Sequence, residues 1–328
     1  MSFKTTDGLM RHLRDNGIDI SGSVQKRQLI NTGYFHGYKG YRFFRTASNP
    51  IKFNSFNEVY ATIKYDSNLK ALFYSKIMYI ETAVKNTALN RIMIEANSEH
   101  INNMFSKVIA SYNSFPVGTD EKTRKKAQTH KLMLETNVHA ALSNSYKKDN
   151  PQITHFYNRD GYSGVPLWAL FEILTLGEFA NLLSCLNFNT REKITLDLGM
   201  QVASIDTNRE LIYKYLYILK DLRNAVAHNA VVFDTRFRKF DPSKAMKKCL
   251  QQEFNLAAPV SFKNIDDYLI LICYYLKLLK VSKKEIRSFI NEFEKITNAY
   301  TKEVSSGVSA KVINPNIKII LQNLKNSL

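Results

Sequence analysis

Residues 211–229 have the sequence LIYKYLYILKDLRNAVAHN, in which apolar side chains recur every three or four positions. This is the spacing of one face of an α-helix, so we expect that face to be buried. Thr207 and Glu210 have capping-box spacing and predict where the helix begins. The recurring apolar residues are Leu211, Tyr215, Leu219, Leu222 and Val226.

The end of this helix carries four polar residues, Asp221, Arg223, Asn224 and His228. If the helix reaches the histidine, it shares one stripe with the aspartate and the asparagine, and the arginine lies about 100° around the helix from the asparagine. A histidine with a pKa near its usual value of about 6.5 can move the proton of a ribose 2′-hydroxyl or of the leaving oxygen. The arginine fork suits phosphate oxygens, and the asparagine can orient the ring or the phosphate. Because DNA lacks the 2′-hydroxyl, this metal-independent chemistry selects RNA.

The pattern alone leaves a second interpretation open. A cationic group at a helix C-terminus also interacts favourably with the helix dipole, and Asn229 would serve as a left-handed cap. A looser match, Arg124 to His130, lies in the charged run of residues 121–126 with no apolar helix leading into it. That match indicates a solvated surface rather than a second catalytic pair.

Residues 222–229, LRNAVAHN, resemble the arginine-x4-histidine signature of HEPN ribonucleases. Several further segments, in order along the chain, are similar to the AbiD/AbiF abortive-infection family of bacterial phage-defence proteins. They are LINTGYFHGY (29–38), YD (65–66) with Leu69, IMYIETAVKN (77–86), HFY (155–157) and VPLWALFEILTLG (165–177). The family more often has arginine where Lys85 stands, and residues 97–151 resemble nothing in it.

The resemblance implies an all-α, HEPN-like helical bundle that forms a homodimer through the motif face, with two sites near its axis. It also implies RNA cleavage, a structured small non-coding RNA as partner or regulator, and a likeness to the nuclease domains of RNA-guided Cas13 effectors. The catalytic residues are then Arg223, Asn224 and His228. Glu81 and Asp221 would support them, although Glu81 and Lys85 also have the spacing of an ordinary helix ion pair.

Composition sets independent limits. With 45% hydrophobic residues the chain can bury a substantial core, and its net charge of +17 favours a polyanion as partner. Basicity alone does not separate RNA from DNA or an acidic membrane. The three cysteines, Cys185, Cys249 and Cys273, are far apart, so we expect no disulfide framework, metal site or cofactor. Residues 1–7 lack a signal-peptide core and no apolar run is long enough to span a bilayer, which predicts a cytoplasmic protein with no membrane partner.

We expect an N-terminal helical module at residues 1–49 and a HEPN-like domain at 50–328 with a basic helical insertion around 97–151. In the module, aromatic rings alternate with Lys39, Arg42 and Arg45. Such a mixture suits unpaired RNA, although core packing is the stronger expectation for the rings. The RNA-binding candidates are Lys39, Arg42, Arg45, Arg124, Lys125 and Lys126.

Further helix signals fill in the remaining chain. A short helix is predicted over residues 5–16, stopped by Gly17, and another after Ser55. Asp66 and Ser67 are predicted to start a separate long helix. Pro166 predicts a helix start, with Trp168 in the core, and Gly177 a break. Residues 268–279 predict a buried helix and residues 286–300 an amphipathic one. Residues 305–307 are expected to separate these from a basic tail ending in a short helix.

Two classes of function follow. The first is an abortive-infection endoribonuclease acting on cellular or phage RNA and regulated by a partner. The second is a non-catalytic RNA-binding HEPN protein that acts as an interaction module in a ribonucleoprotein. The intact Arg223, Asn224 and His228 favour the first. The first 30 residues carry too little basic clustering to favour a helix-turn-helix DNA-binding protein.

Overall fold

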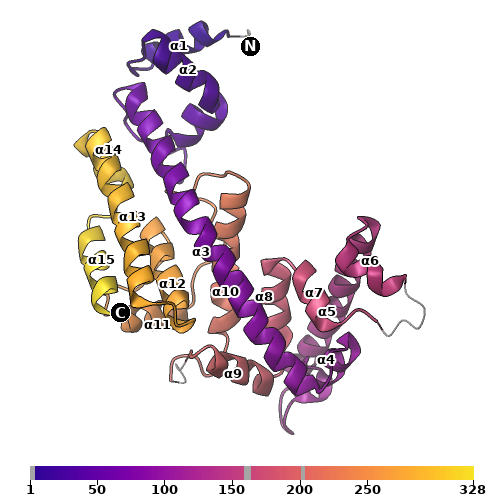
Figure 1. Cartoon of the computed structure of the whole chain (residues 1–328). Helices are drawn as coiled ribbons and strands as arrows, with labels where there is room; N and C mark the ends of the chain where they lie inside the picture. Colours follow the sequence, from indigo (N-terminus) through magenta and orange to yellow (C-terminus); the bar gives the residue numbers. More distant parts are fainter. Residues whose placement is uncertain (1–3, 159–163, 201–203) are drawn as a thin grey trace. The chain divides into compact units, whose positions relative to one another are not determined.

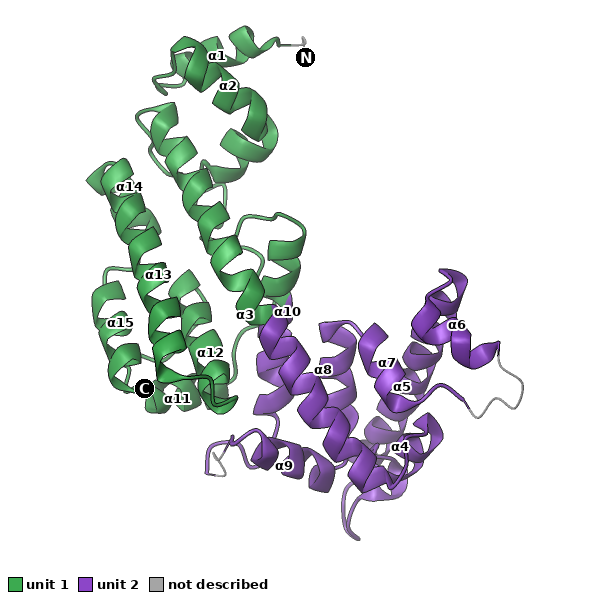
Figure 2. Cartoon of the chain, viewed as in Figure 1, with its two compact units in different colours: residues 1–77, 221–328 green, residues 78–220 purple. Residues whose placement is uncertain are grey.

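The computed structural model describes residues 4–158, 164–200 and 204–328, so the first three residues of the segment inspected for a signal peptide lie outside it. The described residues form helices and isolated β-bridges without a strand, which confirms the predicted all-α class (Figure 1). The chain forms two compact units, unit 1 from residues 1–77 and 221–328 and unit 2 from residues 78–220 (Figure 2). Helices α3 (Phe56–Ala96) and α10 (Leu211–Ala227) contribute to both units. The expected boundary near residue 49 lies inside unit 1, and residues 97–151 belong to unit 2.

Unit 1 combines the two ends of the chain. Figure 1 shows α12, α13 and α15 side by side, and these three helices pack against one another. Helix α12 is buried along nearly its whole length, as the apolar run at 268–279 predicts. Besides parts of α3 and α10, the helices of unit 1 are α1 (Thr6–Asp15), α2 (Gly22–Thr32), the π-helical η1 (Gly33–Lys39), α11 (Lys244–Glu253), α12 (Ile265–Leu278), α13 (Lys283–Glu303), α14 (Ser306–Val312) and α15 (Ile317–Asn326).

Aromatic contacts join α13 to the first part of α3. The ring of Phe73 contacts those of Phe289 and Phe293, with centroids 6.2 and 6.1 Å away. Tyr65 stacks on Tyr300 at 4.5 Å. All five rings are buried, and burial of a Phe-sized side chain stabilises a fold by about 1.5–3 kcal/mol. The amphipathic helix predicted over 286–300 is therefore confirmed, with α3 as its partner.

Unit 2 is built around the long helix α5. Leu134, Val138 and Leu142 form its buried face, and it packs against α6, α7 and α8. Besides parts of α3 and α10, the helices of unit 2 are α4 (Ile101–Lys107), η2 (Tyr112–Ser114), α5 (Glu121–Lys147), α6 (Pro151–Tyr157), α7 (Leu167–Ile173), α8 (Leu176–Cys185) and α9 (Phe188–Asp197).

The predicted second helix start at Asp66 is wrong. Residues 56–96 contain no glycine or proline and form one continuous helix, α3. The side chain of Asp66 is fully buried in the middle of this helix. It does not cap a helix end because, as described below, its oxygens accept hydrogen bonds from other segments.

Helix starts differ from prediction at two further places. The start of α10 is capped by Asp206, whose carboxylate accepts from the N–H groups of Glu210 and Leu211 at 2.8 and 2.9 Å, rather than by Thr207. The break or bend predicted at Gly177 falls instead at Leu174 and Thr175, between α7 and α8. Gly177 itself is the second residue of α8, which begins with a capping box between Thr175 and Glu178. The short helix at the start of the chain is confirmed as α1, capped by Thr5.

Two other local predictions are corrected. Trp168, expected in the core, is 44% exposed, and its indole N–H donates to Glu99 at 3.2 Å. The polar indole nitrogen is satisfied at the surface while Phe156 packs on the ring edge. Residues 306 and 307, expected in a linker, begin α14, with Ser305 at its N-cap.

Candidate functional site

Helix α10 ends in a Schellman motif directly after the predicted site residues. Asn229 has a φ of +53°, and its N–H donates to the carbonyl of Val226 at 3.2 Å. The N–H of Ala230 donates to the carbonyl of Ala225 at 2.8 Å. This pair of bonds satisfies carbonyls that a helix end leaves without partners, so the predicted left-handed cap at Asn229 is confirmed.

The site residues lie at different depths around this end. Asn224 and His228 are exposed one turn apart, and the N–H of His228 donates to the carbonyl of Asn224 at 3.0 Å. Arg223 is half-buried. Asp221 is buried, and its carboxylate accepts from the backbone N–H of Lys239 at 3.3 Å. The exposed stripe therefore consists of the asparagine and the histidine, while the aspartate contacts the segment that follows the motif.

A buried ion pair in α3 reaches the residue after His228. Lys70 pairs with Asp66 at 2.8 Å, and the side chains are 9% and 0% exposed. The same ammonium group donates to the side-chain oxygen of Asn229 at 2.9 Å. Because a buried charge is costly without partners, this geometry holds Asn229 in one orientation.

Asp66 also binds the chain beyond α10. One carboxylate oxygen accepts from the backbone N–H groups of Val232 and Phe233, both at 2.7 Å, and the other accepts from the hydroxyl of Tyr41 at 2.8 Å. Burial and the neighbouring carboxylate raise the pKa of Tyr41, so its hydroxyl remains a donor. With Lys70, the carboxylate thus has four donors drawn from three segments of the sequence.

The N-terminal aromatic segment also reaches Asn229, the residue after His228. The side-chain nitrogen of Asn229 lies 3.4 Å from Nε2 of His36, which is exposed on η1. Since the oxygen of Asn229 accepts from Lys70, the amide nitrogen is the donor here, which assigns the acceptor role to Nε2 of His36. The neighbouring Phe35 is 83% exposed. His228 therefore precedes Asn229 in the chain, His36 contacts Asn229, and the exposed ring of Phe35 is next to His36.

A second buried carboxylate fixes this segment. Asp234 is fully buried, pairs with Arg236 at 2.6 Å and accepts from the backbone N–H of Arg45 at 2.6 Å. Arg236 in turn donates to the carbonyls of Gly40 and Phe43 at 2.7 and 3.0 Å. The predicted RNA ligand Arg45 also uses its guanidinium within the fold, donating to the carbonyl of Asp234 at 3.2 Å, and burial lowers its pKa.

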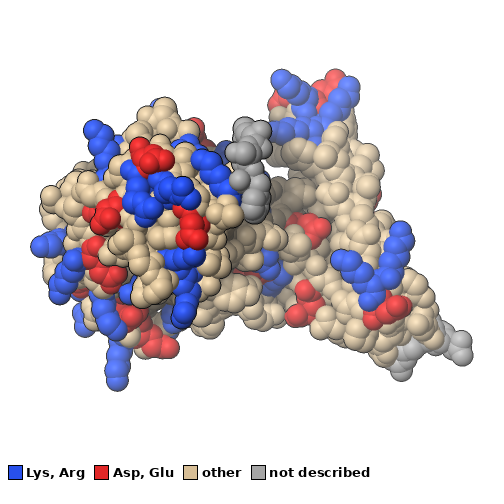
Figure 3. Space-filling model, turned by 90° about the horizontal axis from the view of Figure 1, so that it is seen from above, with Lys and Arg blue, Asp and Glu red and all other residues tan. Residues whose placement is uncertain are grey.

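The remaining RNA-binding candidates fall into two groups. Arg42 is exposed beside η1, and Lys39 lies over the ring of Tyr34 at 5.6 Å. In unit 2, Arg124 donates to carbonyls of the loop before α5, whereas Lys125 and Lys126 are exposed, the former paired with a glutamate one turn away at 2.8 Å. Figure 3 shows Lys and Arg side chains interspersed with acidic ones over the visible surface rather than gathered in one stripe.

Glu81 belongs to unit 2, where it pairs with Lys85 at 3.0 Å. The pair is largely buried, and the lysine also donates to the carbonyl of Leu174 at 2.6 Å. The helix ion pair that the spacing indicates is therefore present, although it is largely buried rather than exposed. The predicted support of the catalytic residues by Glu81 stays a prediction.

Sequence reasoning gave no site role to Lys70, Asp66 or His36. The spacing of Asp66 and Lys70 within an apolar helix was a usable signal, because a charged pair on a buried helix face needs a partner. That partner, the chain after α10, lies more than 150 residues away and has no sequence pattern of its own.

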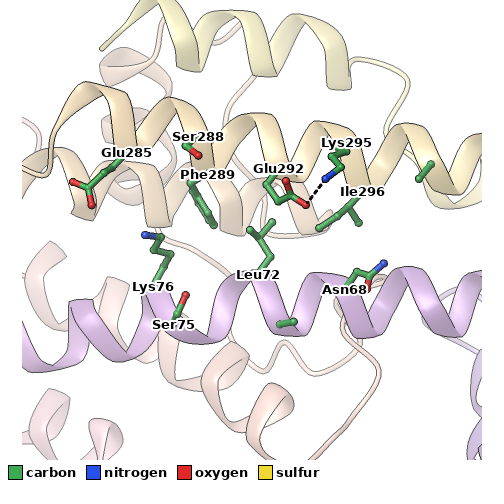
Figure 4. Close-up of a pocket in the computed structure, with 12 residues that line it drawn as sticks. Asn68, Leu72, Ser75, Lys76, Glu285, Ser288, Phe289, Glu292, Lys295 and Ile296 are labelled. Atoms are coloured by element: carbon green, nitrogen blue, oxygen red, sulfur yellow. Dashed lines mark hydrogen bonds and ion pairs between the residues drawn. The ribbon is translucent and has the colours of Figure 1, made fainter.

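A groove of about 690 Å³ in unit 1 lies between α3 and α13 (Figure 4). Its walls combine Leu72 and Phe289 with charges of both signs, including Glu292, which pairs with Lys295 at 3.5 Å. None of the predicted site residues lines it. Its balanced charge does not suit a polyanion, so the end of α10 remains the candidate site.

Residues 27–234 match the model of a family described as Abi-like protein, which is more than half of the chain. No curated protein and no solved structure matches the chain. The matched span begins before η1, contains Asp66 and the whole of α10, and ends at Asp234. It thus includes every segment that meets at Asn229 and Asp66. The chain belongs to the Abi-like protein family, an abortive-infection family.

Proposed function

We propose that this protein is an anti-phage ribonuclease that cleaves RNA without a metal ion at the end of α10. The observation that carries the proposal is the presentation of His228. Its side chain is exposed one turn beyond Asn224, at a helix end held by the hydrogen bond between Lys70 and Asn229. The buried pair of Lys70 and Asp66 fixes the residue next to His228, which supports a defined position for the imidazole.

The proposed reaction is an internal transesterification. His228 accepts the proton of a ribose 2′-hydroxyl, whose oxygen forms a bond to phosphorus while the bond from phosphorus to the 5′-oxygen breaks. The leaving 5′-oxygen takes up a proton from water, and His228 returns its proton to the solvent, so that no net proton is gained or lost. Arg223 stabilises the added charge on the phosphate oxygens, and Asn224 orients the phosphate or the ring. The products are a 2′,3′-cyclic phosphate and a 5′-hydroxyl.

The segment around η1 is the proposed RNA contact. Phe35 offers an exposed ring for an unpaired base, and Arg42 offers an exposed cation for a phosphate. Phe35 and Arg42 lie in and beside η1. The contact of His36 with Asn229 brings η1 to the residue next to His228. The net charge of +17 supports binding to a polyanion.

We propose a homodimer that pairs the motif faces of two chains, because one chain carries one motif. If each site takes Arg223 from one copy and His228 from the other, mixing the two inactive alanine variants restores roughly a quarter of wild-type activity, since half of the dimers are mixed and each has one intact site. A dimer whose mixed variants stay inactive would place both residues of a site on one chain. A monomer at the assay concentration would overturn the dimer.

The proposed regulator is a structured small non-coding RNA, since an unrestrained ribonuclease would damage its own cell. RNA that co-purifies from the native host with wild-type protein and with the Arg223→Ala, His228→Ala double variant should be sequenced and its ends mapped. One abundant structured species on both proteins supports an RNA partner. Diverse fragments with cyclic-phosphate ends on the wild type alone contradict it and point to an enzyme acting without one.

The catalytic proposal is tested with purified Arg223→Ala, Asn224→Ala and His228→Ala and an unstructured RNA labelled at its 5′-end. His139→Ala, which removes an exposed histidine on α5, is the matched control. We expect cleavage by the wild type and the control, loss in Arg223→Ala and His228→Ala, and no cut at a position carrying a single 2′-deoxyribose. Full activity of either variant would sink the catalytic assignment. RNA bound but never cleaved by any of these proteins would favour the non-catalytic RNA-binding alternative.

A further inference from the structure

A cavity of about 480 Å³ lies in unit 2, and no residue of the proposed reaction lines it. It is lined by the loop before α5 and by residues of α5, α8, α9 and the first turns of α10. The residues that define its character are Phe115, Lys126, His130, Arg191, Glu210 and Tyr213. Its volume is within the range of pockets that hold small molecules.

Arg191 is the principal charge of this cavity. Its Nε donates to the carbonyl of Asn208 at 3.2 Å, and one terminal nitrogen donates to the carbonyls of Ser184 and Leu186, both at 3.3 Å. All three acceptors are neutral. Among the described residues, the second terminal nitrogen has no hydrogen-bond acceptor and no carboxylate pairs with the guanidinium. The fold therefore holds this side chain in place through neutral acceptors, while the carboxylates of Glu210 and Asp206 act on it through space, without a direct ion pair among the described residues.

The surroundings increase the need for an anion. Burial removes water from the guanidinium of Arg191 and lowers its pKa, although the nearby carboxylates of Glu210 and Asp206 act in the opposite direction. The one carboxylate of the lining, Glu210, is already engaged by Lys214 and by the hydroxyl of Tyr213. Lys126, exposed on α5, adds a further positive charge at the cavity.

The walls suit a planar group. The ring of Tyr213 lies 5.9 Å from the guanidinium of Arg191, and Phe115 and Tyr217 also line the cavity. Aromatic rings next to a guanidinium with one terminal nitrogen left over match the two parts of a nucleotide, a stacking base and a phosphate.

We propose that this cavity binds a nucleotide, with its phosphate on Arg191 and Lys126 and its base against the aromatic wall. The nucleotide is either free or the phosphorylated end of an RNA, since both present the same chemistry. The site lies in unit 2 and requires no cleavage, so it goes beyond the proposed ribonuclease.

The test measures binding by isothermal titration calorimetry on the full chain. Probes are AMP, adenosine, inorganic phosphate, and one short RNA with either a 5′-phosphate or a 5′-hydroxyl. The RNA titrations use the His228→Ala variant, because the wild-type protein could cleave the RNA probe during the measurement. Lys126→Glu reverses a charge at the cavity, and Lys122→Glu, one turn earlier on α5 and outside the lining, is the matched control.

We expect AMP or the 5′-phosphorylated RNA to bind more tightly than adenosine, phosphate or the 5′-hydroxyl RNA. Lys126→Glu should weaken that binding about tenfold or more, corresponding to roughly 1.4 kcal/mol, whereas Lys122→Glu should change it less than about twofold. If AMP binds and Lys126→Glu weakens that binding more than Lys122→Glu does, the ligand is a free nucleotide. If only the phosphorylated RNA binds, the ligand is the end of an RNA. Arg191→Lys, which keeps the charge but loses the remaining terminal nitrogen of the guanidinium, should also weaken binding.

The proposal is overturned if neither AMP nor the phosphorylated RNA binds saturably, or if the two lysine reversals have equal effects. These outcomes do not depend on whether the protein cleaves RNA. Conversely, loss of cleavage in His228→Ala leaves the nucleotide site untouched.

Discussion

The ammonium group of Lys70 lies 2.9 Å from the side-chain oxygen of Asn229, the residue that follows His228. It also lies 2.8 Å from the buried carboxylate of Asp66. One side chain thus connects the middle of α3 to the end of α10. If His228 is catalytic, Lys70 is a positioning residue, acting on the backbone next to the imidazole without touching RNA.

Lys70→Met should therefore lower kcat about tenfold to a hundredfold, because small displacements of a catalytic group have effects of this size, while KM changes by less than about threefold. The free energy of unfolding should fall by about 1–3 kcal/mol, since the buried carboxylate of Asp66 loses a hydrogen-bond donor. Lys70→Arg should recover part of kcat. Lys64→Met, which removes an exposed lysine from the same helix, is the control. A wild-type kcat in Lys70→Met would show that this contact does not position the histidine.

Phe35→Ala should weaken binding of single-stranded RNA by about 1–3 kcal/mol, the contribution of one base stacked on an aromatic ring. Filter binding on a catalytically inactive background measures this directly. Val24→Ala, which shortens a side chain that is 69% exposed on the neighbouring α2, should leave affinity unchanged. Because Phe35 is 83% exposed, its removal should not lower the melting temperature. Unchanged RNA affinity in Phe35→Ala would remove η1 from the RNA contact.

We expect the stability of the fold to depend on pH because of Asp266, a buried residue in the first turn of α12. Burial, with Asp267 beside it, raises the pKa of Asp266 to about 7, whereas an unfolded aspartate has a pKa of about 3.9. Between these values the folded chain holds a proton that the unfolded chain has lost. The free energy of unfolding should therefore fall as pH rises from about 4 to about 7.

Asp266→Asn should flatten this slope and leave the protein about 1–3 kcal/mol more stable, relative to wild type, at pH 8 than at pH 5. The amide oxygen can still accept from Asn314, which donates to the aspartate at 2.8 Å. Urea unfolding at the two pH values measures the difference, with the exposed Asp15→Asn as control. Parallel pH profiles for wild type and Asp266→Asn would contradict the assignment.

Cleavage should persist with EDTA in excess, because the proposed reaction uses an imidazole and a guanidinium. An unstructured substrate keeps RNA folding, which itself responds to divalent ions, out of the assay. Initial rates with and without chelator should agree within about twofold, whereas a metal-activated water would be lost together with its ion. Abolition by EDTA and recovery on adding a divalent ion would replace the proposed mechanism with a metal-dependent one.

The helices were predictable where one local pattern decided the outcome. The buried α12, the amphipathic α13 and the left-handed Asn229 follow from apolar spacing and capping rules. Local rules failed where tertiary contacts decided. Aspartate is a residue type that often caps helices. Here, however, the carboxylate of Asp66 accepts from the backbone N–H groups of Val232 and Phe233, and the residue lies inside α3.

The candidate site divides in the same way. Arg223, Asn224 and His228 could be singled out because they lie within one short segment, at the end of α10, that resembles a known motif. The partners of Asn229 come from η1 and α3, and the contact between Lys70 and Asn229 spans 159 positions. No periodicity links such residues. Arg45 is the converse case: its place among basic and aromatic residues suggested an RNA contact, whereas its backbone N–H and its Nε donate to Asp234. Its contact with RNA stays a prediction.

The packing of α13 on α3 limits how the chain can be shortened. The family match ends at residue 234, yet Phe73 and Tyr65 inside it are covered by Phe289, Phe293 and Tyr300 beyond it. A gene fragment cut at the end of the match would expose these rings to water and present an aggregation-prone surface. The segment that matches the family is therefore not a portable module, and a premature stop codon before α13 would leave Tyr65 and Phe73 without the rings that cover them.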